Sequence, residues 1–283
     1  MRSWITLGVL LAAVLALGAW IYLKPSARDA ATYPISTLKA AQVKRVKLER
    51  PDSTQPVVLE KKDAAWRLTA PFAARADDFQ VGRMLSILDA RAAVRYPATE
   101  LARYGLDRPV ARLAVDDEGF SFGGLNKMTR EQYVQKGDAV YVLPLAPGAS
   151  LPRDAEALVS RALLSADEVP LRFALPGFSV TLADGAWRVE PARNDASADE
   201  RVAWVDAWRH ASAIRVTRHA GGAPSASISV MLKDGATLKL GVVDREPELV
   251  LLRDDEGLQY HFPAAVAKRL LSPPGEPRKS VTK

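Results

Sequence analysis

The sequence predicts an α+β protein, in which an N-terminal transmembrane helix is followed by two similar repeats, each an antiparallel sheet packed with one amphipathic helix. Three observations lead to this prediction. The chain of 283 residues begins with a long uncharged apolar run, and it then alternates short apolar segments with acidic-glycine turns. It also repeats the same order of patterns at an offset of 119 to 123 residues.

The apolar run extends from Trp4 to Leu23 without a charged residue. Twenty helical residues measure about 30 Å, the thickness of the hydrocarbon core of a bilayer. Trp4 at one end, and Trp20 with Tyr22 at the other, lie where aromatic rings prefer the headgroup level. We therefore expect residues 1–24 to be an uncleaved signal-anchor in the lipid bilayer. A cleaved secretory signal is the alternative, although no uncharged small-x-small site follows Leu23.

The charges around this run bear on which side of the membrane the body lies. Arg2 precedes the run, whereas Lys24, Arg28 and Lys39 follow it. A count of positive charges alone would keep the body in the cytoplasm, but long domains are translocated largely regardless of charge. We expect a single-pass protein of the bacterial inner membrane, with residues 25–39 as a linker and the body in the periplasm.

The composition excludes several kinds of chemistry. Without cysteine, the chain has no disulfide, no thiolate nucleophile and no cysteine-bound zinc. The three histidines are His210, His219 and His261, and none lies at metal-ligand spacing from another. We therefore expect neither a metal nor a cofactor.

The net charge of +6 is spread along the chain. Its densest basic patch combines Lys44, Arg45, Lys47 and Arg50 with intervening valine and leucine residues. We interpret this patch as the solvated face of a strand, and contact with anionic headgroups is the alternative. Because neither interleaved aromatic residues nor a known motif accompanies the charge, we expect no binding of nucleic acid.

The repeat begins with a tryptophan strand. Trp66-Arg67-Leu68 corresponds to Trp187-Arg188-Val189, and a proline follows each at Pro71 and Pro191. An amphipathic helix is then predicted in both copies, because apolar residues recur at i, i+3, i+4 and i+7. Acidic residues near the start of each helix satisfy free backbone N–H groups. The apolar positions are Val81, Met84, Leu85 and Leu88 in the first helix and Trp204, Ala207, Trp208 and Ala211 in the second, and the acidic ones are Asp77, Asp78, Asp199 and Glu200.

Two hairpins follow each helix, because acidic-glycine turns separate alternating segments. In the first copy the turns are 117–119 and 136–138, and in the second they are 233–235 and 254–257. Short helices are predicted to close the copies, at Ala155–Leu164 and at Ala264–Leu271. The predicted boundaries are therefore 40–165 for the first repeat, 166–272 for the second, and 273–283 for a disordered tail without apolar residues to bury.

One motif occurs in the first copy alone. The segment from Thr99 to Pro109 predicts a short helix, closed by Gly105 in a left-handed conformation and prevented from resuming by Pro109. Trp66, Pro71 and Asp77, together with Tyr104-Gly105-Leu106-Asp107-x-Pro109 and Ser160-Arg161-x-Leu163-Leu164, resemble the uncharacterised bacterial family called domain of unknown function 4340. The resemblance covers about residues 58 to 172. It implies that these motif residues have a structural role. It implies an N-terminal anchor and no catalytic residue. Some members are encoded near ATP-driven export systems, including gliding-motility machinery, so it also implies an envelope partner.

Few residues suggest catalysis. Ser36 and Lys39 match the S-x-x-K pattern, but the companion motifs of penicillin-recognising enzymes are absent. The triplets Asp116-Asp117-Glu118 and Asp254-Asp255-Glu256 are interpreted as turn tips that project into solvent, and Asp77-Asp78 as a helix cap. Phosphate loops, nucleophile elbows and dinucleotide fingerprints are missing.

Four tryptophans remain as candidates for a binding cleft in the seam between the repeats: Trp66, Trp187, Trp204 and Trp208. Their strand and helix positions favour core packing instead. The leading hypothesis is thus a non-enzymatic module that binds another envelope or exporter protein, for example a subunit of an ABC-type export system. The alternatives are a module that binds an envelope glycan or lipid, and an unrecognised hydrolase.

Overall fold

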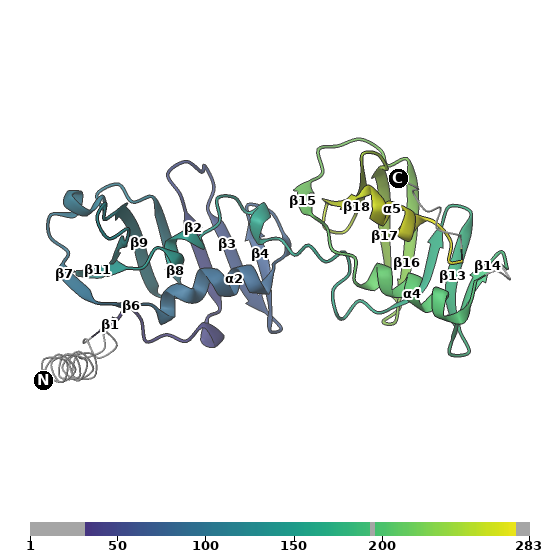
Figure 1. Ribbon diagram of the computed structural model, residues 1–283, viewed down its shortest axis with the longest axis horizontal. Coiled ribbons are helices and arrows are strands. Elements are labelled where there is room, and N and C mark those ends of the chain that lie inside the picture. The colour runs from purple at the N-terminus through teal and green to yellow at the C-terminus, as the bar shows by residue number, and fades with distance from the viewer. Residues whose placement is uncertain (1–31, 193–195, 276–283) are drawn as a thin grey trace, which may run out of the picture. The chain divides into compact units, whose positions relative to one another are not determined.

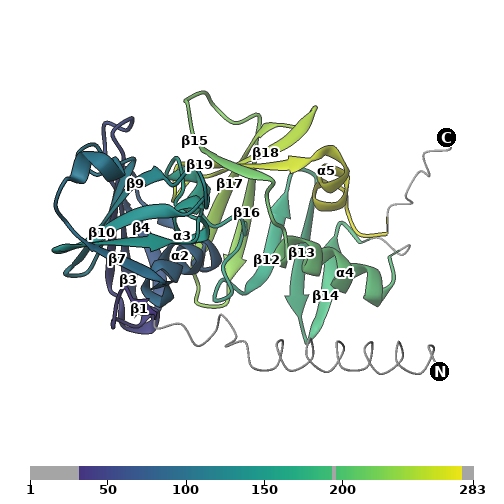
Figure 2. The ribbon, with the colours of Figure 1, turned by 60° about the vertical axis from the view of Figure 1, so that its left-hand side comes forward.

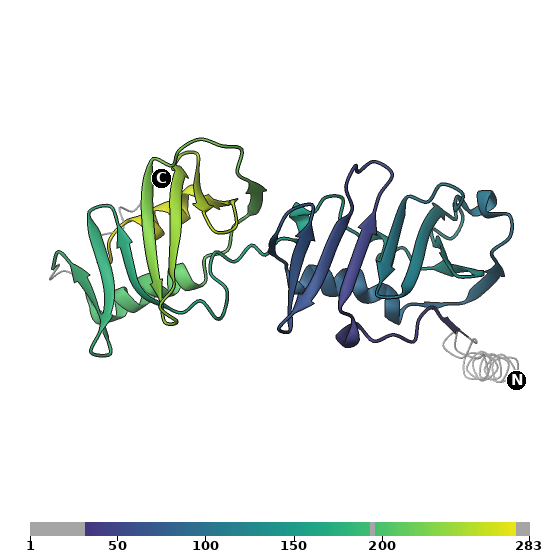
Figure 3. The same ribbon diagram turned by 180° about the vertical axis from the view of Figure 1, so that it is seen from behind.

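The computed structural model describes residues 32–192 and 196–275. These residues form mostly antiparallel sheets with few helices, as the α+β prediction requires (Figures 1 and 3). The predicted anchor, Trp4 to Leu23, lies outside the described residues. Within them, no helix combines the length and the apolar character that crossing a bilayer would need.

The first large sheet has nine strands in the order β5-β4-β3-β2-β8-β9-β10-β11-β7. Alternation between buried and exposed residues explains strands such as β2, where Val46 and Leu48 are buried while Arg45 is exposed. The predicted strand face is confirmed for Arg45 and Lys47, whereas Lys44 and Arg50 of the basic patch flank β2, and Arg50 Nη2 donates to the Leu151 carbonyl at 3.0 Å. The bounds are β2 Arg45–Glu49, β3 Val57–Lys62, β4 Ala65–Ala70, β5 Ala74–Arg75, β7 Val94–Pro97, β8 Ala111–Val115, β9 Glu118–Leu125, β10 Gln132–Lys136 and β11 Ala139–Leu143.

The second large sheet has eight strands in the order β14-β13-β12-β16-β17-β18-β19-β15. Its predicted hairpins are confirmed, because β16 pairs with β17 and β18 pairs with β19. The bounds are β12 Pro170–Leu175, β13 Phe178–Ala183, β14 Ala186–Glu190, β15 Arg215–Arg218, β16 Ala226–Leu232, β17 Thr237–Asp244, β18 Glu248–Arg253 and β19 Leu258–Pro263.

The chain divides into two compact units. The described part of the first comprises residues 32–43, 50–52 and 84–151, with a core that includes Phe120 and Phe122. The second comprises residues 44–49, 53–83 and 152–275 apart from 193–195, and it contains strands β2 to β5 together with the eight-stranded sheet. Phe173, Trp208 and Phe262 are among its fully buried side chains.

Both predicted amphipathic helices are present, α2 at Asp78–Leu85 and α4 at Ala198–Arg209. The 3-10 helix η2, Ser86–Asp89, continues α2. All eight residues of the two predicted apolar stripes are buried. Ser197 and Glu200 form a reciprocal capping box at the start of α4. Each helix lies across one face of its sheet (Figures 1 and 3).

The predicted closing helices have different outcomes. Ala264–Leu271 is helical as predicted and forms α5, which packs against α4, β18 and β19 (Figure 2). The helix predicted at Ala155–Leu164 is wrong: only η4, Glu156–Leu158, is helical there, and the chain then extends. Backbone pairing replaces helix formation, because the Ser160 N–H donates to the Arg75 carbonyl and the Leu163 N–H donates to the Ala211 carbonyl. Tertiary pairing thus overrides local propensity. A four-residue helix, α3 Ala146–Ala149, was not predicted.

Residues at both ends of the described chain pack against other segments, including the first three residues of the tail predicted to be disordered. In the linker 25–39, Tyr33–Pro34 forms β1, which pairs with β6, Arg91–Ala92, and Ile35 is buried. In the tail 273–283, Pro274 is buried, and Gly275 lies against Ala196. The remaining tail, 276–283, lies outside the described residues.

Candidate functional site, a buried arginine and carboxylate cluster

The family motif residues of the first unit have structural roles. Tyr104 ends the 3-10 helix η3, Leu101–Tyr104, and Gly105 adopts the predicted left-handed conformation with φ of 66°. Leu106 is buried, and a side chain at Gly123 would lie 2.4 Å from the Tyr104 carbonyl oxygen. The predicted short helix is therefore confirmed as 3-10. Of the last two motif residues, Asp107 is exposed and Pro109 is buried.

The motif residues that precede helix α2 support its first turn. Asp77 Oδ1 accepts hydrogen bonds from the N–H groups of Phe79 and Gln80, as the predicted cap requires. Trp66 is buried in β4, and its backbone N–H donates to Asp78 Oδ1. Pro71 follows the same strand and is half-buried.

Three of the four candidate tryptophans gather around Phe173. The ring centroids of Trp187, Trp204 and Trp208 lie 6.3, 5.1 and 5.5 Å from the Phe173 centroid. The Trp204 Nε1–H donates to the Ser272 carbonyl, and the Trp208 Nε1–H donates to the Leu270 carbonyl. Trp208 is fully buried and Trp187 half-buried, so these rings form the core beneath α4. Trp66 contacts Lys61 and takes no part in the ring contacts found among the described residues.

The carboxylate triplets correct the sequence interpretation. Glu118 accepts a 2.5 Å hydrogen bond from Ser36 Oγ, and its other oxygen lies 2.7 Å from Lys136 Nζ. Ser36 therefore contacts Glu118, whereas Lys39 is exposed. Glu256, predicted to project into solvent, has only 9% of its side chain exposed. A carboxylate in a turn can point into the protein where it pairs with a buried cationic side chain.

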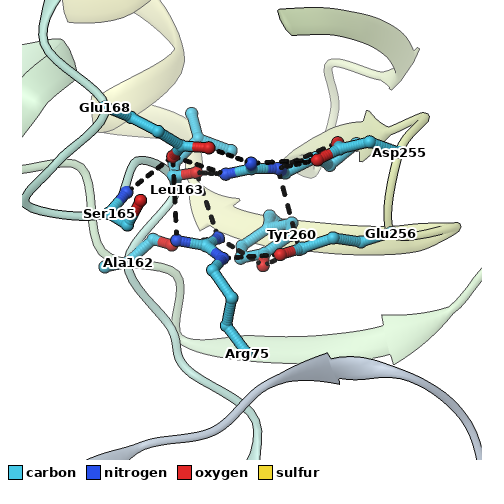
Figure 4. Close-up of polar contacts among 9 residues, drawn as sticks. Arg75, Ala162, Leu163, Ser165, Glu168, Asp255, Glu256 and Tyr260 are labelled. Atoms are coloured by element: carbon cyan, nitrogen blue, oxygen red, sulfur yellow. Dashed lines mark hydrogen bonds and ion pairs between the residues drawn. The ribbon is translucent and has the colours of Figure 1, made fainter. Parts of the chain in front are cut away.

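Glu256 belongs to a cluster with Arg75, Glu168, Arg253 and Tyr260, all in the second unit (Figure 4). The cluster draws on four elements of the chain. Arg75 ends β5, Arg253 ends β18, Tyr260 lies in β19, and Glu168 precedes β12. Exposure is 8% for Arg75 and 3% for Arg253. Two guanidinium groups buried this deeply need carboxylate partners.

Arg75 connects β5 to the hairpin of β18 and β19. Its Nε donates to Glu256 Oε1 at 2.5 Å, and its Nη2 donates to Tyr260 Oη at 2.9 Å. Nη2 also donates to the carbonyl oxygen of Ala162 at 2.9 Å. Its Nη1 is buried without a hydrogen-bond partner in the described structure and lies 3.9 Å from Glu168 Oε2.

Arg253 lies beside Arg75 and uses every guanidinium nitrogen. Nη1 donates to the Leu163 carbonyl at 2.7 Å and to Glu168 Oε2 at 2.9 Å. Nη2 donates to Glu168 Oε1, and Nε donates to Asp255 Oδ1 at 3.0 Å. The fork-to-fork contact with Glu168 is the strongest geometry available to this pair. Glu168 also accepts from the Ser165 N–H at 2.7 Å.

The electrostatics of the cluster fix its charges at neutral pH. Burial disfavours the ionised form of Glu168, but hydrogen bonds from Arg253 and from the Ser165 N–H outweigh it and lower its pKa to about 2. Burial likewise opposes the charge of Arg253, yet Glu168 and Asp255 raise its pKa above the ordinary value. Burial raises the pKa of Tyr260, with Arg75 opposing and Glu256 adding to the shift. Tyr260 therefore stays a neutral phenol that donates to Glu256 Oε2 at 2.5 Å.

Acid should weaken the second unit because of Glu168. Its folded-state pKa of about 2 lies below its ordinary value of 4.5, so its stabilising contribution is complete above pH 4.5. The contribution is lost as the pH falls from 4.5 towards 2, and it is on the order of 3 kcal/mol. Urea unfolding at several pH values across this window should show the loss, and Glu168→Gln should reduce the acid dependence. Equal acid dependence in both proteins would contradict this assignment.

The three histidines each contact a polar group other than a carboxylate. His261 Nε2 lies 2.9 Å from Thr217 Oγ1, His219 Nδ1 lies 2.9 Å from Gln259 Nε2, and His210 Nδ1 lies 2.9 Å from the Asp206 carbonyl. In the part of the chain that the structure describes, no three potential metal ligands lie close together.

Sequence reasoning missed Arg75, Glu168 and Arg253. One signal was available for Arg253, because it ends a strand whose preceding four residues are all apolar, Leu249 to Leu252. A charged residue continuing a buried strand needs a buried partner. No comparable pattern marks Arg75 or Glu168, whose partners are distant in sequence.

Comparison with known proteins identifies a family without a described activity. No curated protein and no solved structure matches this chain. A family model described as "Domain of unknown function (DUF4340)" matches residues 66–207, which is half of the chain and includes Trp66, the Tyr104 motif and most of helix α4. The chain belongs to the DUF4340 family.

Proposed function

We propose that this chain is a non-enzymatic, single-pass membrane protein of the cell envelope, whose sheet-rich body binds another protein on the periplasmic side of the bacterial inner membrane. The uncharged run from Trp4 to Leu23 supports the tether. The gene neighbourhood of the family makes a subunit of an ATP-driven exporter the first partner to test.

The hydrogen-bonded geometry of the buried cluster, together with its pKa shifts, supports the non-enzymatic proposal. A general acid or base works best when its pKa lies near the working pH. Glu168 has a pKa of about 2, the pKa of Arg253 is raised, and the hydrogen bonds of both groups engage protein atoms. Such groups hold a structure together and exchange no proton at neutral pH.

We also propose that the body consists of two copies of one α+β repeat, whose boundaries differ from those of the two compact units. The order β4-β3-β2-β8-β9-β10-β11-β7 corresponds strand by strand to β14-β13-β12-β16-β17-β18-β19-β15, and β5 is the extra strand. Helix α2 precedes β7 as α4 precedes β15, and α3 follows β11 as α5 follows β19. Matching helices at matching points of the same strand order favour duplication over coincidence.

The segments that lead into each repeat support the same proposal. The Ile35 N–H donates to the Ala90 carbonyl, and the Leu163 N–H donates to the Ala211 carbonyl. The Ile35 carbonyl accepts a hydrogen bond from Lys136 at 2.9 Å, and the Leu163 carbonyl accepts one from Arg253 at 2.7 Å. Lys136 ends β10 and Arg253 ends β18, which hold the same place in the two strand orders. The buried Arg253 is thus the counterpart of Lys136.

Photo-crosslinking in native membranes tests the partner. A photoreactive residue would replace Phe79 in one variant and Ile214 in another, because these side chains are 70% and 46% exposed. Mass spectrometry should recover one membrane protein from one position and not from the other. The same protein recovered equally from both positions, or no protein from either, would contradict a specific partner. Loss of the chain from carbonate-washed membranes would contradict the tether.

A further inference from the structure

The turn between β9 and β10 holds an apolar side chain in water. Asn126 Oδ1 accepts from the Met128 N–H at 3.0 Å, the Arg130 N–H donates to the Asn126 carbonyl at 2.8 Å, and the Asn126 N–H donates to the Glu131 carbonyl at 2.8 Å. These bonds order the turn. Met128 is nevertheless 94% exposed, and Leu125 beside the turn is 51% exposed. Such exposure leaves apolar surface in contact with water that burial would remove.

Aromatic side chains adjoin this turn. The ring centroids of Tyr104 and Tyr133 are 4.9 Å apart, and those of Tyr96 and Tyr104 are 5.8 Å apart. Tyr133 follows Gln132, which pairs with Leu125 across the hairpin. Tyr96 is 40% exposed, whereas Tyr104 and Tyr133 are half-buried, so partly exposed aromatic rings flank the strands that lead to the apolar turn.

The charged residues are also distributed unevenly between the two ends of the hairpin. Lys127 and Arg130 are exposed in the turn beside Met128, with Glu131 as the neighbouring acid. At the opposite ends of these strands, the turn from β8 to β9 carries Asp116 and Asp117, and the turn from β10 to β11 carries Asp138, which lies 3.5 Å from Arg95. The apolar end is therefore basic and the other end acidic, which suits an anionic surface at the apolar end.

Strand register places the incoming chain at this apolar end. Val94 begins β7 and pairs with Val142, whose neighbour Leu143 pairs with Gln132 beside the turn. Tyr33 pairs with Ala92, two residues before Val94. Ten peptide steps separate Leu23 from Tyr33. A fully extended chain of this length spans about 35 Å, which is the largest possible distance between Tyr33 and the end of the predicted anchor.

We propose that the tip formed by Leu125, Lys127, Met128 and Arg130 rests in the headgroup region of an anionic bilayer. The apolar side chains enter the boundary of the acyl chains while the two cations stay among the phosphates. This inference rests on the proposed tether, which brings the tip to the membrane. A bilayer fits this tip better than a protein pocket does because the tip is basic and only ten peptide steps join the predicted anchor to Tyr33.

The absence of cysteine makes the contact measurable at one site. The full-length Met128→Cys variant, labelled with an environment-sensitive fluorophore, would be placed in lipid nanodiscs that contain phosphatidylglycerol and nitroxide-labelled lipid. The matched control is Asp117→Cys, exposed at the acidic end. We expect several-fold stronger quenching at position 128 than at 117. Quenching at 128 should fall in phosphatidylcholine-only discs and when Lys127→Gln and Arg130→Gln are added.

The outcomes separate this inference from the tether. A chain that stays with the discs but shows equal quenching at both positions overturns the tip contact alone. A chain that separates from the discs overturns the tether and the tip contact together. Absence of quenching in discs, combined with crosslinking of position 128 to a protein in cells, would assign the tip to a protein partner and also overturn the proposal.

Discussion

Replacing Arg253 by methionine should lower the free energy of unfolding by about 3–5 kcal/mol. Methionine keeps an unbranched apolar stem but lacks the guanidinium group, so it removes every hydrogen bond to Glu168, Asp255 and the Leu163 carbonyl. The loss arises mainly because Glu168 would remain charged, with only 17% of its side chain exposed. Urea unfolding followed by circular dichroism measures the change.

A double mutant tests this explanation. In Arg253→Met/Glu168→Gln the uncompensated charge is gone, so stability should recover towards the wild type, since replacing both members of a buried pair is often nearly neutral. Arg215→Met is the matched surface control, because Arg215 pairs with Glu248 at 2.6 Å while 54% exposed. It should cost no more than about 1 kcal/mol. A double mutant less stable than Arg253→Met alone would refute the unpaired-charge mechanism.

Local patterns predicted the elements that depend on local periodicity. The stripes of Val81 and Met84 in α2 and of Trp204 and Trp208 in α4 are buried, because a 3.6-residue period places them on one helix face. The hairpins followed from acidic-glycine turns. The helix expected after Pro152 failed because its backbone pairs with Arg75 and Ala211, far away in sequence. No local signal carries that information.

The buried cluster could not be predicted from local sequence patterns for the same reason. Glu256 follows two aspartates in a turn, so local rules place it in solvent, whereas Arg75, 181 residues away, draws it inward. The Glu168 and Arg253 pair likewise spans 85 residues. The tryptophans were better anticipated, because their spacing on α4 and their size both favour the core.

Trp208→Ala should be as damaging as the loss of Arg253. The ring is fully buried and contacts Phe173 and Trp204, with centroid distances of 5.5 and 5.9 Å. Truncation leaves a large cavity and frees the Leu270 carbonyl that Nε1–H now engages at 3.1 Å. The expected loss of unfolding free energy is about 3–5 kcal/mol.

This substitution separates the core role of Trp208 from the role of a ligand-binding aromatic. Val202→Ala lies on the exposed face of the same helix, at 47% exposure, and should change stability by less than about 0.5 kcal/mol. Thermal unfolding of both variants, followed by near-ultraviolet circular dichroism, reports the aromatic packing directly. If Trp208 lined a cleft, the alanine variant would keep the stability of the wild type. Because its ring fills the space between α4 and Phe173, we expect the stability and the aromatic signal to fall together.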